Sequence, residues 1–237
     1  MSSFLLVHGG SHGAWCWDPV IACLTRSGHH AWAFDLPGHG RDATPRNHLT
    51  IASYADAISA QIAGHQDHDL VVVGHSLAGI ALAQGISPHV ERVTHAVYLA
   101  AIILQPGERA IDRVPEDRRP IYFDLAAQST DNTIRLPYEM ARPTFFSDLP
   151  EDQARLYYDS LTPQALSVYL DTATVDASTL DVANHSIVCR NDQALGYRPT
   201  LEYANQLGGT ITEIDAGHDV MLSRPDVLAR TLGELIS

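Results

Sequence analysis

The sequence predicts an α/β fold in which a six-stranded, mainly parallel sheet is flanked by helices. Short apolar runs alternate with stretches of helical periodicity from residue 4 to residue 105, and again after residue 184. Two of the expected strands, 70–73 and 93–103, are predominantly apolar, as is typical of strands covered by helices on both faces. Loops rich in glycine and proline close several strands. This alternation indicates parallel strands joined by right-handed crossovers.

Each element follows from a local pattern. Apolar runs predict strands at 4–7, 30–34, 70–73, 93–103, 186–189 and 210–214. Apolar residues at helical spacing predict helices at 15–26, 49–64, 76–86, 198–207 and 225–236. Gly28 closes the first helix, and Thr50 or Ser53 can cap the second.

Between residues 106 and 183 the alternation stops. This segment contains six prolines from Pro115 to Pro163 and two helical patterns, at 151–159 and 163–172. It is too long for a simple loop and too broken to continue the sheet. We therefore expect a core, residues 1–105 and 184–237, and an inserted, mainly helical cap, residues 106–183, above the strand ends.

Composition narrows the class of protein. A chain of 237 residues with 45% hydrophobic content fits one domain with one core. The formal net charge of −13 argues against nucleic acid and anionic membrane surfaces as partners. All fifteen basic residues are arginine, which excludes Schiff-base chemistry and every other lysine-dependent mechanism.

The three cysteines predict a reducing compartment. The chain has an odd number of cysteines, Cys16, Cys23 and Cys189, and none of them forms a CxxC motif. We therefore expect thiols in the core rather than a disulfide or a zinc site. The first residues, MSSFLLV, lack the basic region and long apolar stretch of a secretion signal, and no apolar run reaches bilayer-spanning length. We therefore expect a cytoplasmic protein. The sequence leaves a monomer and a homodimer open.

The most informative stretch is LVVVGHSLAG, residues 70–79. A β-branched run ends in Gly74-His75-Ser76, and a helical pattern with small residues follows. This order is typical of a nucleophile elbow, in which a serine on a strained turn projects its hydroxyl. Ala78 occupies the place where a second glycine is usual, and it is small enough for close packing. Ser76 is the candidate nucleophile, and a structural serine on an ordinary turn is the alternative.

A nucleophilic serine needs a base, and the base needs an acid to orient it. His218 follows the last strand, where a loop can aim its ring at Ser76, and it is the candidate base. Asp192 follows the preceding strand and is the candidate acid.

Three other carboxyl groups compete with Asp192 for the role of the acid. Glu108 remains an alternative because related folds sometimes carry the acid after the strand that follows the elbow. Asp215 and Asp219 lie too close to His218 in the chain to turn back onto its ring.

The oxyanion of the reaction needs two donors that are already in place. The backbone N–H of Leu77, next after the nucleophile, is one candidate, and the backbone N–H of Gly10 in the loop after the first strand is the other. No HExxH or comparable ligand cluster occurs among the thirteen histidines, so we expect neither a metal nor a cofactor.

Five motifs in this order and spacing carry a resemblance to a known family: LLVHGGSHGAWCW, FDLPGHG, GHSLAG, SIVCRNDQAL and IDAGHDVML. The sequence resembles the α/β-hydrolase superfamily, and within it the plant methylesterase and hydroxynitrile lyase group with its bacterial esterase relatives. The resemblance covers roughly residues 4–105 and 185–236. It implies an α/β-hydrolase fold and a catalytic triad of Ser76, Asp192 and His218.

Two positions separate the branches of that group. The resemblance implies a threonine after the first loop histidine and a lysine after the catalytic histidine in the lyases, whereas this chain has Gly9 and Asp219 there. Lyase chemistry is therefore disfavoured. We expect a serine hydrolase that cleaves a small carboxylic ester, and the resemblance suggests a methyl or short alkyl ester of an apolar or aromatic acid.

Two alternatives to this expectation remain. The same triad could act on a lactone, a thioester or a biosynthetic intermediate, with Arg109, Arg113 or Arg142 selecting an acidic substrate. The fold could instead serve a ligand-binding receptor with a vestigial site.

Overall fold

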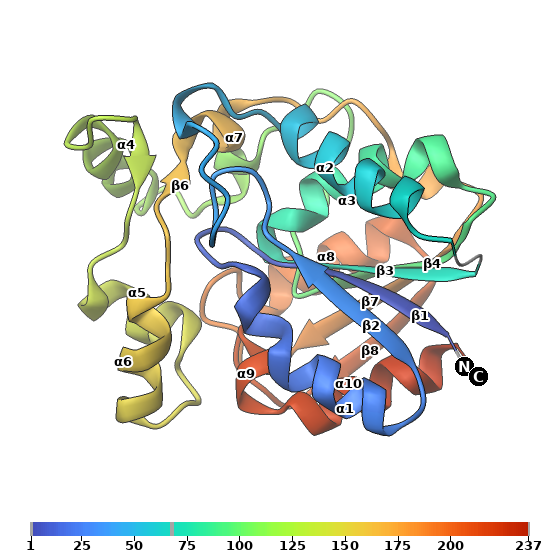
Figure 1. Cartoon of the computed structure of the whole chain (residues 1–237). Helices are drawn as coiled ribbons and strands as arrows, with labels where there is room; N and C mark the ends of the chain where they lie inside the picture. The colour runs from blue at the N-terminus through green and yellow to red at the C-terminus, as the bar shows by residue number, and fades with distance from the viewer. Residues whose placement is uncertain (1, 67–68, 237) are drawn as a thin grey trace.

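A six-stranded sheet forms the centre of the computed structural model, which describes residues 2–66 and 69–236 (Figure 1). The strands are β1 (Ser3–Val7), β2 (His30–Phe34), β3 (Leu70–His75), β4 (Val93–Leu99), β7 (Ala183–Cys189) and β8 (Thr210–Ile214). All pair in parallel, in the order β2-β1-β3-β4-β7-β8. The predicted fold class is confirmed, and the six predicted strands are present.

Helices cover both faces of this sheet (Figure 1). One layer contains α1 (Asp18–Arg26), α9 (Val220–Ser223) and α10 (Pro225–Leu235), and the other contains α2 (Ile51–Gly64), α3 (Gly79–Ile86) and α8 (Tyr197–Leu207). Side chains of β1 alternate between the layers, since Phe4 and Leu6 pack in the first core and Leu5 and Val7 in the second. Thr50 and Ser53 form a capping box at the start of α2. Among the described helices, none is both long and apolar enough to cross a bilayer.

Residues 106–170 fold over the carboxyl ends of the strands, on the side opposite the two termini, and residues 171–182 return along the sheet to the start of β7 (Figure 1). The segment contains α4 (Arg119–Ala127), β5 (Thr133–Ile134), α5 (Tyr138–Phe145), α6 (Glu151–Asp159), β6 (Gln164–Ala165) and α7 (Leu166–Leu170). Strands β5 and β6 pair antiparallel.

Several element boundaries differ from the sequence expectation. The helix expected at 163–172 is wrong in its first part, because Gln164 pairs with Ile134 in the small sheet and the helix is limited to α7. The strand expected at 93–103 ends at Leu99, because Ala100 has φ = 42° and leaves the extended conformation. The helix expected at 15–26 divides into a 3-10 turn, Ala14–Trp17, and α1.

Candidate active site

Ser76 lies at a sharp turn between β3 and a 3-10 turn, Ser76–Ala78, that leads into α3. Its φ is +54°, a left-handed conformation that costs free energy in a non-glycine residue and presents the side chain above the sheet. Close packing around the turn makes this conformation possible. A Cβ atom on Gly79 would lie 2.5 Å from the carbonyl oxygen of Ile102, so no larger residue fits there.

A continuous hydrogen-bonded chain links Ser76, His218 and Asp192. The Ser76 hydroxyl lies 2.9 Å from Nε2 of His218, and Nδ1 of His218 lies 2.9 Å from Oδ2 of Asp192. Oδ1 of Asp192 accepts the backbone N–H groups of Ala194 at 2.7 Å and Leu195 at 3.1 Å. His218 and Asp192 are buried, whereas Ser76 is partly exposed. The structure therefore brings the three predicted triad residues together in the predicted order.

The electrostatics of this chain suit a general base. Burial by itself lowers the pKa of His218, but the charge and hydrogen bond of Asp192, together with the charge of Asp219, outweigh it and raise the pKa above its ordinary value. Burial raises the pKa of Asp192, and the charge and hydrogen bonds of His218 and the two backbone N–H groups reverse this and lower it. Asp192 is thus held as a carboxylate, which orients the ring and stabilises its protonated form.

The other candidate acids point elsewhere. Oε2 of Glu108 accepts the backbone N–H of Gln105 at 2.9 Å and a guanidinium N–H of Arg113 at 2.5 Å. Asp215 accepts the side-chain amide of Asn191 at 2.7 Å on the surface. The hydrogen-bonded partner of His218 is Asp192 rather than any of these carboxyl groups.

The loop after β1 brings Gly10 next to Leu77. A Cβ atom on Gly10 would lie 3.1 Å from Cδ2 of Leu77. Two histidines hold consecutive carbonyl groups of this loop, since Nδ1 of His8 lies 2.8 Å from the oxygen of Gly9 and Nδ1 of His12 lies 2.8 Å from the oxygen of Gly10. Both peptide groups are therefore fixed in orientation, which is what a preorganised oxyanion site requires.

His8 has a second anchor. Its Nε2 accepts the backbone N–H of Leu36 at 2.9 Å, and burial lowers its pKa to about 4. His8 is therefore neutral at physiological pH and ties the loop after β1 to the end of β2.

A buried pair, His12 and Asp219, lies behind the triad. Nε2 of His12 contacts Oδ2 of Asp219 at 2.9 Å, and both side chains are inaccessible to solvent. Because the carbonyl of Gly10 can only accept, His12 donates to it from Nδ1. Asp219 thereby anchors the loop that carries Gly10.

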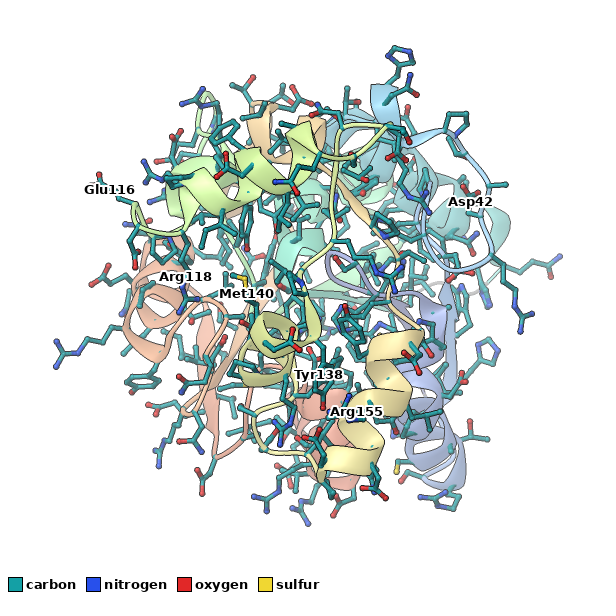
Figure 2. All side chains as sticks on the ribbon, turned by 90° about the vertical axis from the view of Figure 1, so that its left-hand side faces the viewer. Asp42, Glu116, Arg118, Tyr138, Met140 and Arg155 are labelled. Atoms are coloured by element: carbon teal, nitrogen blue, oxygen red, sulfur yellow. The ribbon has the colours of Figure 1, made fainter. Side chains whose placement is uncertain are left out.

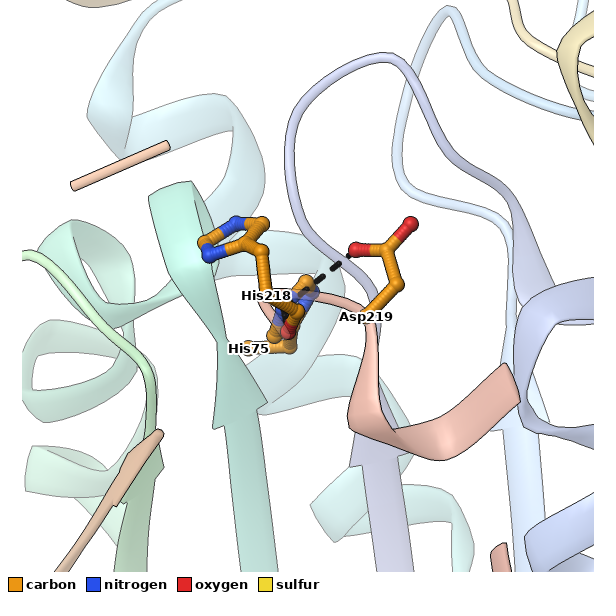
Figure 3. Close-up of side chains that lie close together, drawn as sticks. All are labelled: His75, His218 and Asp219. Carbon is orange, nitrogen blue, oxygen red and sulfur yellow. Dashed lines mark hydrogen bonds and ion pairs between the residues drawn. The ribbon is translucent and has the colours of Figure 1, made fainter. Parts of the chain in front are cut away.

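His75, His218 and Asp219 offer three potential metal ligands within 4.8 Å of one another (Figure 3). In Figure 3 the His218 ring points away from the Asp219 carboxylate, and the dashed line joins Asp219 to His75 at 3.8 Å. Both ring nitrogens of His218 are engaged, by Ser76 and Asp192. A metal ion bound to His218 would displace Ser76 or Asp192 from its ring. The three side chains are therefore better described as members of a hydrogen-bonded network than as a metal site.

A pocket opens above Ser76, between the core and residues 106–183. Its lining includes Gly10, Ser76 and Gln164 near the base, and it is largely apolar and aromatic, with Ile102, Val114, Tyr122, Ile134, Leu136, Phe145, Tyr169 and Leu195. The described residues that line it include two charged side chains, Arg113 and Arg118. Arg118 also lines an outer hollow with Met140, and Figure 2 shows the two close together on this face.

The three arginines considered from sequence have different surroundings. Arg109 pairs with Asp112 on the surface. Arg142 donates to the carbonyl groups of Phe146 and Leu149, so it fastens the cap backbone. Arg113 reaches the pocket but is neutralised by Glu108.

The profile of the alpha/beta hydrolase family matches residues 4–231. The chain belongs to the α/β hydrolase family. It is 28% identical over 170 residues to a pheophorbidase of Raphanus sativus, covering 68% of this chain and 64% of the relative. It is also 26% identical over 251 residues to methylesterase 9 of Arabidopsis thaliana. That alignment covers 98% of this chain and 97% of the relative.

Coverage of the relatives is uneven. The chain covers about half to two thirds of the length of the first curated relatives, which are the pheophorbidase and two probable esterases PIR7A of Oryza sativa. An extracellular α/β-hydrolase structure from a Paenibacillus species superimposes with a TM-score of 0.88 at 22% identity, covering 99% of this chain and 98% of that one. The predicted resemblance to plant methylesterases and bacterial relatives is confirmed.

Sequence reasoning missed His8, His12 and Asp219 as supports of the loop after β1, and Gln164 as a lining residue. The spacing HGGSH, with a histidine on each side of the glycines, is the signal that could have suggested the first two. Nothing local marks Gln164 or connects Asp219 to His12, because 207 positions separate the latter two.

Proposed function

We propose that the protein is a cofactor-free serine hydrolase that cleaves a small carboxylic ester through an acyl-enzyme intermediate. The observation that carries this proposal is the chain from Ser76 through His218 to Asp192, with both contacts at 2.9 Å, at the base of a largely apolar pocket. The names of its relatives, which include esterases and methylesterases, support the same reaction class.

In the first half of the reaction, the Ser76 oxygen attacks the ester carbonyl while its proton moves to Nε2 of His218. The N–H groups of Gly10 and Leu77 stabilise the negative charge on the carbonyl oxygen. His218 then donates the proton to the departing alkoxide, which leaves as an alcohol. In the second half, water loses a proton to His218 and attacks the acyl group, which releases the carboxylic acid and restores Ser76.

A methyl or short alkyl ester of an apolar or aromatic acid suits this pocket, because aliphatic and aromatic side chains form much of its lining, beside Arg113 and Arg118. Lyase chemistry is disfavoured on geometric grounds. A Cβ atom on Gly9 would lie only 2.8 Å from Cβ of Ser76, which leaves no room for a threonine. Asp219 faces His12 instead of presenting a cation to the pocket.

The proposal is tested by turnover of p-nitrophenyl acetate and by labelling with a fluorophosphonate probe. We expect Ser76→Ala to abolish labelling and to lower kcat by about a millionfold, as loss of a serine nucleophile does elsewhere. Ser160→Ala, an exposed serine at the end of α6, is the matched control and should retain both. Equal turnover by wild type and Ser76→Ala would refute the serine mechanism, and tight ligand binding without labelling would favour a receptor.

A further inference from the structure

The peptide group between Ala216 and Gly217, directly before His218, is hydrogen-bonded at both of its polar ends. Its carbonyl accepts the backbone N–H of Asn191 at 3.0 Å, and its N–H donates to Oδ2 of Asp148 at 2.7 Å. The plane of this peptide group can therefore turn only if one of the two hydrogen bonds breaks. Its orientation sets the direction in which the main chain enters His218.

The two partners of this peptide group come from different parts of the fold. Asn191 directly precedes Asp192, so it belongs to the loop that supplies the acid of the triad. Asp148 lies in the cap, in the turn between α5 and α6, and 69 positions separate it from Gly217. Asp148 thus connects the cap directly to the loop of the base.

Close approach of the cap explains why a glycine occupies position 217. A Cβ atom there would lie 2.7 Å from Oδ1 of Asp148 and 2.9 Å from Oγ of Ser147. Both distances are shorter than ordinary van der Waals contact, so a larger residue would push the cap turn away. The φ of Gly217 is not positive, so the backbone conformation itself does not require glycine.

Anchored residues on both sides hold the turn that carries Asp148. Guanidinium N–H groups of Arg142 donate to the carbonyl of Leu149 at 2.8 Å and to the carbonyl of Phe146. The side chains of Phe146 and Leu149 are buried in the core. The carboxylate of Asp148 is therefore presented to the N–H of Gly217 by a turn that is already ordered, which lowers the entropic cost of the contact.

The same turn also lies beside the ring of the base. Phe145, at the end of α5, lines the pocket above Ser76, and the centroids of its ring and the His218 ring are 6.0 Å apart. A displacement of the turn would therefore change the surroundings of both the backbone and the ring of His218.

We propose that Asp148 is a positioning residue for His218, and that the cap takes part in the reaction through it. This role rests on the proposed esterase function, because it is a role within that triad. Asp148 is not among the residues that line the pocket. It acts through Gly217 and keeps the ring of His218 2.9 Å from both Ser76 and Asp192. A displacement of about 1 Å can lower a catalytic rate by about a hundredfold, so the contact has a measurable effect.

Labelling of Ser76 by a fluorophosphonate and hydrolysis of p-nitrophenyl acetate test this role, at a temperature where each variant is folded. We expect Asp148→Ala to lower both rates by roughly ten- to hundredfold, because the N–H of Gly217 loses its acceptor. Asp148→Asn should stay within about threefold of the wild-type rates, since a backbone N–H can only donate and the amide oxygen turns to it. Asp159→Ala, which removes an exposed aspartate in the last turn of α6, is the matched control and should react as the wild type does.

A proton NMR signal separates positioning from a purely structural role. The proton on Nδ1 of His218 lies in the 2.9 Å contact with Asp192, and its low-field resonance is assigned by its loss in His218→Gln. We expect Asp148→Ala to shift or broaden this resonance, and Asp148→Asn and Asp159→Ala to retain it. A lower melting temperature in Asp148→Ala, with unchanged labelling, hydrolysis and resonance, would overturn the inference, because the contact would then only fasten the cap.

A substitution on the other side of the contact provides an independent test should Asp148→Ala fail to fold. Gly217→Ala places a Cβ 2.7 Å from Oδ1 of Asp148 and should displace the cap turn, so labelling should again slow by roughly ten- to hundredfold. Wild-type labelling by Gly217→Ala would overturn the inference.

Failure of this positioning role is distinguishable from failure of the proposed function. Hydrolysis and labelling by the wild type that Asp148→Ala leaves unchanged overturn the positioning role alone. Absence of both hydrolysis and labelling in the wild type overturns the proposed function, and the positioning role with it.

Discussion

Replacement of Asp192 by asparagine should switch the proton on His218 to the wrong ring nitrogen. In the native site Oδ1 of Asp192 accepts the N–H groups of Ala194 and Leu195, and Oδ2 faces Nδ1 of His218. Backbone N–H groups can only donate, so the oxygen of an asparagine would turn to them and its NH2 would face Nδ1. The ring would then accept at Nδ1 and carry its proton on Nε2, opposite Ser76.

The expected loss is large because a protonated Nε2 cannot take the proton of Ser76. We expect kcat to fall by about ten-thousandfold in Asp192→Asn, as a wrong-tautomer substitution does in serine hydrolases. At about 1.4 kcal/mol per factor of ten, this corresponds to about 5 kcal/mol of lost transition-state stabilisation. Because asparagine matches aspartate in shape and keeps both backbone contacts, the melting temperature should change far less than the rate.

The assay is kcat for p-nitrophenyl acetate, with thermal unfolding measured on the same samples. Glu108→Gln is the matched comparison, because Glu108 contacts Arg113 and Gln105 and should change kcat by less than about threefold. Retention of more than a tenth of wild-type kcat by Asp192→Asn would refute the tautomer reasoning. A thousandfold loss in Glu108→Gln would show that the acid lies on the other strand.

Three further predictions concern the surroundings of the triad. Gly9→Ala places a Cβ 2.9 Å from Nδ1 of the buried His75, so kcat should fall about a hundredfold as the loop moves, whereas Gly64→Ala, with open space around its Cβ, should keep full activity. His218 must be neutral to accept a proton, and its pKa is raised. The value of kcat/KM should therefore increase with pH, and the midpoint of this increase should lie above pH 6.5. Asp219→Asn should keep most of kcat, whereas Asp219→Ala should lower the free energy of unfolding by about 1–3 kcal/mol.

Each of these has a clear contrary result. Full activity in Gly9→Ala would show that the loop tolerates displacement. An acid limb centred below 6.5 in stopped-assay pH profiles would show that the Asp192 charge does not dominate the pKa of His218. Equal denaturant midpoints for Asp219→Asn and Asp219→Ala would remove Asp219 as the anchor of the loop.

Local sequence patterns predict the secondary structure of residues 106–183 less well than that of the core. Helix α4 begins with Pro120 in its first turn, and α5 contains Pro143 in its interior, so proline, normally a sign of interruption, lies within both helices. The sequence pattern predicts a helix where β6 lies. The structure is extended there because Gln164 pairs with Ile134, thirty positions away, and the local pattern does not report this pairing. Packing against distant partners decided these elements, and local propensity carries no information about such partners.

The sequence by itself determined the parallel sheet and the sharp turn at Ser76, and it placed His218 and the two alternative acids, Asp192 and Glu108, in loops that follow strands. Those predictions succeeded because strand periodicity and the loops after strands are local, and the carboxyl ends of parallel strands always meet at one edge of the sheet. Only the tertiary structure decided between Asp192 and Glu108, because both follow strands and the choice depends on which side chain reaches the imidazole. It also decided that the cap hydrogen-bonds the loop of His218, because this contact joins segments that lie 69 positions apart in the chain.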